Sequence, residues 1–188
     1  MDLVMTSQQK RIHPHKFTLW VAICSIIMMF AGLTSAYIIK RNQANWLTFE
    51  LPLVFWYSSA LIILSSFTMM LSQKAFAERE MGKYRRMLAI TTLLGITFIA
   101  LQVIGFIQLS ASGITLTKNV AYSFLYILVG LHAVHVIGGV IALFVMLVRI
   151  FSRRSRNYSI VPVEMMSTYW HFVDLLWIYL FVFLLLIR

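Results

Sequence analysis

Several residue types are scarce in this chain of 188 residues, and their scarcity excludes several kinds of protein. Cys24 is the only cysteine, which excludes an intrachain disulfide and a metal site built from cysteines. Of three prolines, only Pro52 lies within or at a long hydrophobic run. The Gly- and Pro-broken helices typical of transporters are therefore missing. Phosphate-binding loops, nucleotide fingerprints and nucleophile–base motifs are missing too, so we expect no catalytic residue here.

Acidic residues are also scarce, with six Asp and Glu against 16 Lys and Arg and a net charge of +10. Twelve of the basic residues lie in the N-terminal tail and in the second and fourth connections between hydrophobic runs, and four lie on the other side. Under the positive-inside rule, this bias predicts a cytoplasmic N-terminus and a periplasmic or external C-terminus. The charge thus indicates topology and contact with anionic lipid headgroups, and nucleic acid is not an expected partner.

Apolar residues, in contrast, make up 61% of the chain. Five hydrophobic runs are each long enough to cross roughly 30 Å of hydrocarbon as a helix. They span residues 17–39, 52–73, 87–109, 120–150 and 165–187. The sequence therefore predicts an all-α integral membrane protein with five transmembrane helices. Its parts would be a cytoplasmic polar tail at residues 1–16 and a single transmembrane domain at residues 17–188.

Small residues recur at helical spacing in two of the runs. Ser58, Ser65 and Ser72 repeat every seven residues in the second run, and the fourth run has Gly138 and Ala142, with further glycines nearby. Such stripes let helix backbones approach closely in lipid. We therefore expect these positions to face neighbouring helices in a tightly packed bundle.

Ionisable side chains inside the hydrophobic runs are few. His171 and Asp174 share one helix face, and Asp174 lies about 14 Å inside the last run at about 1.5 Å per residue. His132 and His135 have the same spacing in the fourth run. Because the two runs are antiparallel, we expect these four side chains to form one polar cluster, with Gln102 as a candidate fifth member. The cluster could be a static hydrogen-bond network or a proton relay.

The histidines also allow two alternatives to such a network. A b-type haem could use His132 or His135 on one side and His171 on the other, and a metal would need three or four ligands. A lone His-x-x-His pattern is weak support for either. We therefore expect no metal and no haem bound within this chain.

Two more residues, Glu164 and Trp170, belong to the candidate site. Glu164, at the start of the last run, complements the helix dipole and lies near several arginines of the fourth connection, where it could form an ion pair. Trp170 and Trp177 lie seven residues apart on the side of Asp174. They could wall an acyl-chain groove or pack against a neighbouring subunit.

Two C-terminal motifs resemble a known family. The hexapeptide Tyr169–Asp174 (YWHFVD), continued by Leu175–Phe181, resembles the last helix of subunit III of the haem–copper respiratory oxidases, the cytochrome c oxidase subunit 3 family. Residues Gly130–Gly138 (GLHAVHVIG), together with Leu147–Arg149, resemble the helix before it. Supporting similarities, from about Trp20 onward, are Ser25, Phe30–Leu33, Ala36, Tyr37, Gly95, Phe98 and Gln102.

This chain departs from the family pattern in three ways. The common form has seven helices, whereas five are expected here, so the chain resembles a short five-helix form. The family usually has a glutamate directly after the serine that Ser25 matches, and here Ile26 follows. The family's Gln-x-x-Glu is Gln102 followed by Gly105 here. Any proton role of those two glutamates cannot be transferred to this chain.

The resemblance implies a non-redox accessory subunit of a proton-pumping haem–copper terminal oxidase in aerobic respiration. Such a subunit stabilises the catalytic subunit, binds phospholipid and supports proton uptake, while haem and copper belong to the partner. The implied partners are subunits I and II, membrane lipids and other respiratory-complex subunits of a supercomplex, in a bacterial cytoplasmic (inner) membrane. The implied lipid site comprises His132, His135, Glu164, Trp170, His171 and Asp174.

Two other functions stay open at this point. Related short proteins accompany nitric oxide reductases, so the catalytic partner could be a reductase. The histidines and Asp174 could also serve a small proton-coupled transporter that acts alone.

Overall fold

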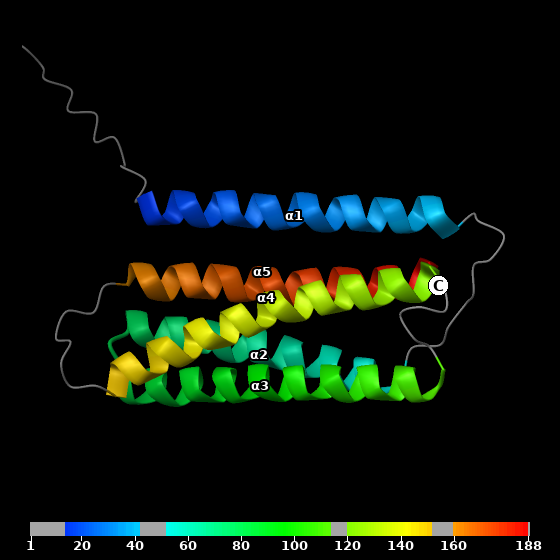
Figure 1. Ribbon diagram of the computed structural model, residues 1–188. Coiled ribbons are helices and arrows are strands. Elements are labelled where there is room, and N and C mark those ends of the chain that lie inside the picture. The colour runs from blue at the N-terminus through cyan, green and yellow to red at the C-terminus, as the bar shows by residue number, and fades with distance from the viewer. Residues whose placement is uncertain (1–13, 42–51, 114–119, 152–159, 188) are drawn as a thin grey trace, which may run out of the picture.

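A computed structural model describes residues 14–41, 52–113, 120–151 and 160–187. These residues form five helices that run up and down in one bundle (Figure 1). The helices are α1 (Pro14–Arg41), α2 (Val54–Ala77), α3 (Met81–Ala111), α4 (Val120–Phe151) and α5 (Val161–Ile187). Each is long and apolar enough to cross a membrane. The predicted all-α fold with five membrane-crossing helices is confirmed for this part of the chain.

Each helix extends beyond its predicted hydrophobic run at one end or both, although α2 begins at Val54, two residues after the predicted start at Pro52. Helix α1 begins at Pro14, three residues before the expected Phe17, because proline suits the first turn of a helix. Helix α3 begins at Met81, six residues before Met87, because its first turns carry charged residues that a hydropathy reading leaves out. The rest of the predicted polar tail, residues 1–13, lies outside the described residues.

Helices α2 and α3 form a hairpin with a three-residue turn at 78–80. Arg79 in this turn has a φ of 60°, a left-handed conformation that allows the tight reversal. Ser58, Ser65 and Ser72 of α2 are all fully buried, as their spacing predicted. The prediction for α4 was wrong at Gly138 and Ala142, which are exposed, whereas the neighbouring Gly139 faces α5.

Helix α1 is the least integrated part of the bundle. It contacts α4 and α5, and among the described residues it makes no contact with α2 or α3. It is also the least buried of the five helices. In Figure 1 it lies along one side of the other four.

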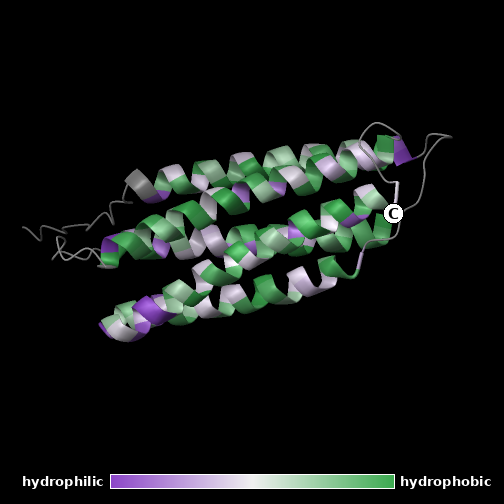
Figure 2. Cartoon of the chain, turned by 60° about the horizontal axis from the view of Figure 1, so that its bottom comes forward, coloured by the Kyte–Doolittle hydropathy of each residue, from purple (hydrophilic) through white to green (hydrophobic). Residues whose placement is uncertain are grey.

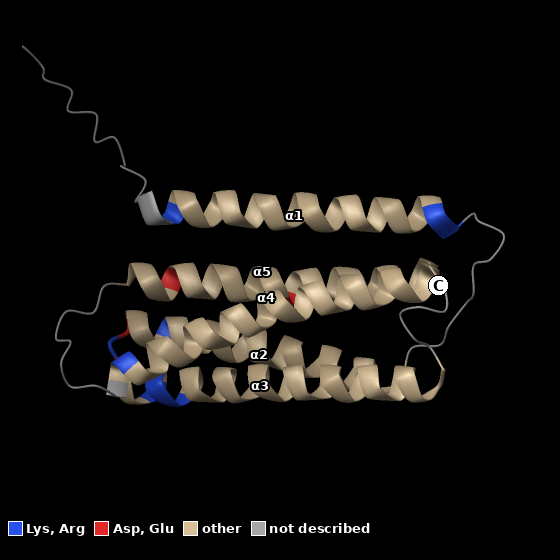
Figure 3. Ribbon diagram, in the orientation of Figure 1, with Lys and Arg blue, Asp and Glu red and all other residues tan. Residues whose placement is uncertain are grey.

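Charge and hydropathy divide the bundle along its length. Lysines and arginines gather where α1 and α3 begin and where α2 and α4 end (Figure 3). We call this the basic end, defined by Lys16, Lys74, Arg79, Lys83, Arg85, Arg86 and Arg149. Figure 2 shows hydrophobic residues along the middle of every helix, as a membrane-embedded bundle requires.

Candidate functional site

Trp170 joins α5 to three other helices. Its indole Nε1 donates to Ser65 Oγ of α2 at 3.0 Å, and its side chain is 1% exposed. The ring fills the space beside two glycines: a Cβ added at Gly95 of α3 would lie 2.8 Å from it, and one at Gly139 of α4 would lie 3.0 Å from it. Trp170 is therefore a packing residue inside the bundle.

Trp177 repeats this arrangement two turns further along α5. Its Nε1 donates to Ser59 Oγ of α2 at 2.9 Å. Its ring lies 5.2 Å from Phe98 of α3 and 5.1 Å from His132 of α4, measured between ring centroids. Two tryptophans and two serines thus link α5 to α2 through indole–hydroxyl hydrogen bonds, which are favourable in lipid because the indole N–H has no water to bind.

The two histidines of α4 face different surroundings. His132 is 0% exposed between aromatic rings, and neither of its ring nitrogens has a hydrogen-bond partner among the described residues. His135 is half-buried, and its Nδ1 donates to the Leu131 carbonyl at 2.7 Å. Its ring lies 5.9 Å from that of Phe30 on α1, and its backbone carbonyl accepts a hydrogen bond from the Tyr169 hydroxyl.

His171 and Asp174 face α2. His171 Nδ1 and Ser66 Oγ share a hydrogen bond at 2.5 Å, and His171 is half-buried. Asp174 is 5% exposed, and its two carboxyl oxygens have no hydrogen-bond partner among the described residues. The Ser66 hydroxyl lies near this carboxyl, but outside hydrogen-bond geometry.

The six predicted site residues therefore divide into separate groups. His171 and Asp174 lie together beside Ser66, as Trp170 does beside Ser65. Within the described ranges, no hydrogen bond joins His132 or His135 to His171 or Asp174. Gln102, the candidate fifth member, donates to Ser58 instead. The α2 serines thus take the place that the sequence analysis gave to the α4 histidines.

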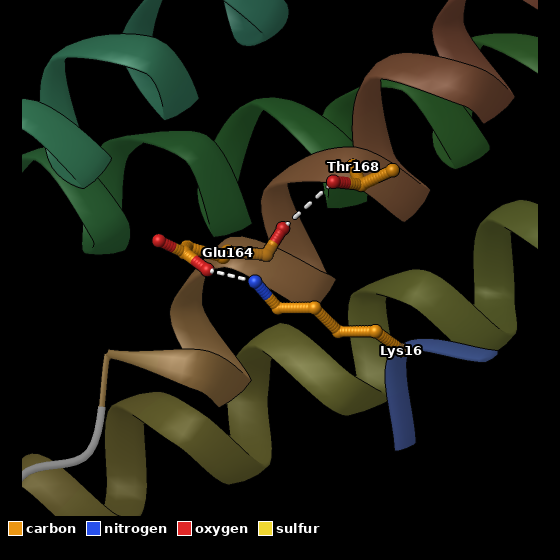
Figure 4. Close-up of polar contacts among 3 residues, drawn as sticks. All are labelled: Lys16, Glu164 and Thr168. Atoms are coloured by element: carbon orange, nitrogen blue, oxygen red, sulfur yellow. Dashed lines mark hydrogen bonds and ion pairs between the residues drawn. The ribbon is translucent and has the colours of Figure 1, made fainter. Parts of the chain in front are cut away.

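Glu164 lies at the basic end, about two helical turns before His171 on α5. Its Oε2 pairs with Lys16 Nζ of α1 at 2.6 Å, and its backbone carbonyl accepts a hydrogen bond from Thr168 Oγ1 at 2.9 Å (Figure 4). Of the expected arginine partners, Arg149 forms no ion pair with Glu164 within the described ranges, and those in 152–159 lie outside them. The ion pair borders a pocket of about 260 Å³, which is lined by Lys16, Leu19, Trp20, Gln73, Glu164, Met165 and Thr168.

Sequence reasoning missed Lys16, Gln73, Thr168 and Ser66 as neighbours of the site. The α2 serines were recognised only as small packing residues. Their hydroxyls gave no sign of which indole or imidazole they would meet, because that depends on how α2 and α5 are rotated against each other. Over the described parts of the chain, no group of three His, Cys, Asp or Glu side chains is placed to hold a metal ion.

Comparison with known proteins bears on the family of this chain. The family model for cytochrome c oxidase subunit III matches residues 16–187, which include α2 to α5 and all but the first two residues of α1. A probable cytochrome c oxidase subunit 3 of Nocardia farcinica is 32% identical over 180 residues, covering 90% of this chain and 85% of the relative.

Two further relatives come from other bacterial groups. Cytochrome c oxidase subunit 3 of Bacillus subtilis is 29% identical, covering 86% of this chain and 81% of the relative. A probable quinol oxidase subunit 3 of Staphylococcus haemolyticus is 26% identical, with 89% and 86% covered. This multi-pass membrane chain therefore belongs to the cytochrome c oxidase subunit III family, as its C-terminal motifs predicted.

Proposed function

We propose that this chain is the non-redox accessory subunit of a proton-pumping haem–copper terminal oxidase, and that it assembles with subunits I and II. The observation that carries the proposal is the family match, which extends through the whole bundle. Haem and copper reside in the catalytic partner, while this chain stabilises that partner and supports its proton uptake.

The exposed apolar surface of α1 supports the proposal that a partner subunit or lipid covers this helix. Phe17, Trp20, Ile27 and Met28 of α1 are each about half exposed or more. Large exposed apolar side chains on a helix that packs against only two neighbours suit a membrane setting, where a further helix or lipid covers them.

Lipid binding, in this proposal, uses the half-exposed residues of the candidate site. Glu164 borders the pocket beside Lys16, which suits a lipid headgroup with both a phosphate and an ammonium group. His171 lies about two turns further along α5. His135 lies against α1. His132, Trp170 and Asp174 act indirectly, because their burial inside the bundle fixes the helices that border the site.

Affinity purification of the tagged chain in a mild detergent tests the assembly. We expect a large haem- and copper-containing subunit to co-elute, with haem absorption in the eluate and none in the stripped chain. Mass spectrometry of the co-eluting chains identifies an oxidase or a nitric oxide reductase as the partner. A haem-free chain that elutes alone would contradict the proposal and favour a small proton-coupled transporter.

Native mass spectrometry of the purified complex tests the lipid site. Lys16→Met should reduce the amount of retained lipid, because it removes the cation that pairs with Glu164 in the pocket. Lys83→Met is the matched control: it removes a lysine at the same end that pairs with Glu80 outside the pocket. Equal lipid retention in both variants would contradict this site.

A further inference from the structure

Four polar residues of α5 form a stripe that starts at the basic end and runs into the membrane. Glu164, Thr168, His171 and Asp174 follow each other at steps of four, three and three residues, which keeps them on one helix face. The ten residues from Glu164 to Asp174 correspond to about 15 Å along the helix axis. The stripe therefore reaches from the headgroup level to about the middle of the hydrocarbon core.

Polar groups of other helices line the same stripe. Lys16 of α1 and Gln73 of α2 border the pocket at its start, together with Glu164 and Thr168. Ser66, seven residues before Gln73 and so on the same face of α2, bonds to His171 further in. Lys16, Gln73, Ser66 and the first three stripe residues are all half-buried rather than buried. Within the described residues the backbones of α1 and α2 do not approach closely, and the pocket that Lys16 and Gln73 border lies between these helices at the start of the stripe.

The stripe ends at a carboxyl group without a partner. Asp174 is buried, and no described cation pairs with it. An ionised carboxylate in that position would be expensive, since nothing compensates for its lost hydration. Intramembrane carboxyls in such surroundings typically bind protons or line ion pathways. The neighbouring His171 and Ser66 can each accept one proton and release another, as relay groups do.

We propose that the Asp174 carboxyl exchanges its proton with water at the basic end, through His171, Ser66 and the pocket bordered by Thr168, Gln73 and Glu164. A proton that leaves the carboxyl passes to the Ser66–His171 pair and then to water in the pocket, and the return follows the same groups. The step transfers only a proton and needs no oxidant or reductant. This inference does not depend on which oxidase subunits the chain assembles with.

Infrared spectroscopy of the full chain in lipid nanodiscs tests the exchange. Asp2 and Asp174 are the only two aspartates, so carbon-13 labelling of aspartate in an Asp2→Asn chain marks Asp174 alone. We expect a carbonyl band of a protonated carboxyl at neutral pH that moves with the isotope label. On transfer into heavy water, this band should shift as deuterium replaces the proton. The absence of a protonated-carboxyl band would overturn the proposal. A band that never shifts in heavy water would overturn it too.

The route is tested by deleting its relay groups. Ser66→Ala and His171→Phe should each slow the deuterium exchange of Asp174 by about tenfold or more, which corresponds to a barrier increase of about 1.4 kcal/mol. Ser65→Ala is the matched control, since it removes the adjacent hydroxyl, which bonds to Trp170 instead. Unchanged exchange in both relay variants, or equal slowing in Ser65→Ala, would overturn the assignment of the path.

Discussion

At the scale of single residues, two glycines and one indole determine how closely the helices pack. The Trp170 ring lies where side chains at Gly95 and Gly139 would otherwise be, so α3, α4 and α5 approach each other around it. Its one polar atom is satisfied by Ser65. In lipid, where apolar surface gives no driving force between helices, such close contacts and hydrogen bonds hold the bundle together.

Gly95→Ala should destabilise the bundle by about 1–3 kcal/mol, because the new Cβ would overlap both Trp170 and Val140. Unfolding in increasing sodium dodecyl sulfate measures the change. Gly138→Ala is the control, since a Cβ there has nothing within 4 Å. Similar stabilities of the two variants would show that the Trp170 contact is looser than described.

The hydrogen bond from Trp177 to Ser59 should have a measurable coupling energy. A double-mutant cycle with Ser59→Ala and Trp177→Phe should give a coupling energy of about 0.6 kcal/mol, the average for hydrogen bonds between membrane helices, and at most about 1.7 kcal/mol. The same detergent unfolding assay supplies the four stabilities. Additive effects of the two substitutions would contradict a direct bond at 2.9 Å.

At the scale of elements, α1 differs from the other helices in how it is held. Contacts that hold it include the Lys16–Glu164 ion pair, the hydrogen bond that the Tyr179 hydroxyl donates to Thr34, and ring contacts such as that of Phe30 with His135. The α2–α3 hairpin, in contrast, packs along its whole length. Part-exposed ion pairs contribute little on their own, so α1 is held mainly by the few side chains that it buries against α4 and α5, such as Phe30 and Tyr37.

We therefore expect amide hydrogen exchange in nanodiscs to be faster in α1 than in α2 and α3. A double variant, Lys16→Met with Tyr179→Phe, should raise α1 exchange further and leave the hairpin unchanged, because neither side chain contributes to α2–α3 packing. Mass spectrometry of peptic fragments gives both readings. Equal protection of α1 and the hairpin in the unmodified chain would refute this view of α1.

At the scale of the whole molecule, charge gathers at one end of an otherwise apolar bundle. The basic end carries Lys16, Lys83 and Arg149, among others, whereas the opposite ends of the described helices carry Lys40 and Arg41. Fixed positive charge on one side orients helices during insertion. The basic end is therefore the side that we propose to be cytoplasmic.

Reporter fusions in a bacterial host test this orientation. Alkaline phosphatase, which is active only outside the cytoplasm, should be active when fused after Arg188 and inactive when fused to the 78–80 turn. A green fluorescent protein at the N-terminus should fluoresce. Phosphatase activity at the 78–80 turn would reverse the proposed topology.

The number of helices, the buried serine positions and the family of this protein can be predicted from its sequence. Five hydrophobic runs are enough to predict five helices, because a membrane allows few other structures for apolar segments of that length. The burial of Ser58, Ser65 and Ser72 follows from their spacing, and the family follows from the motif around His171 and Asp174.

Only the tertiary structure decided which side chains meet. Lys16 and Glu164 pair across 148 residues, and His171 bonds to Ser66 rather than to a histidine of α4. Hydropathy and helical spacing show which face of a helix is polar. They do not show how the helix is rotated about its axis, and so which neighbouring helix that face meets. The rotation is set by packing at sites such as Trp170 against Gly95 and Gly139, where shape, not polarity, determines the contact.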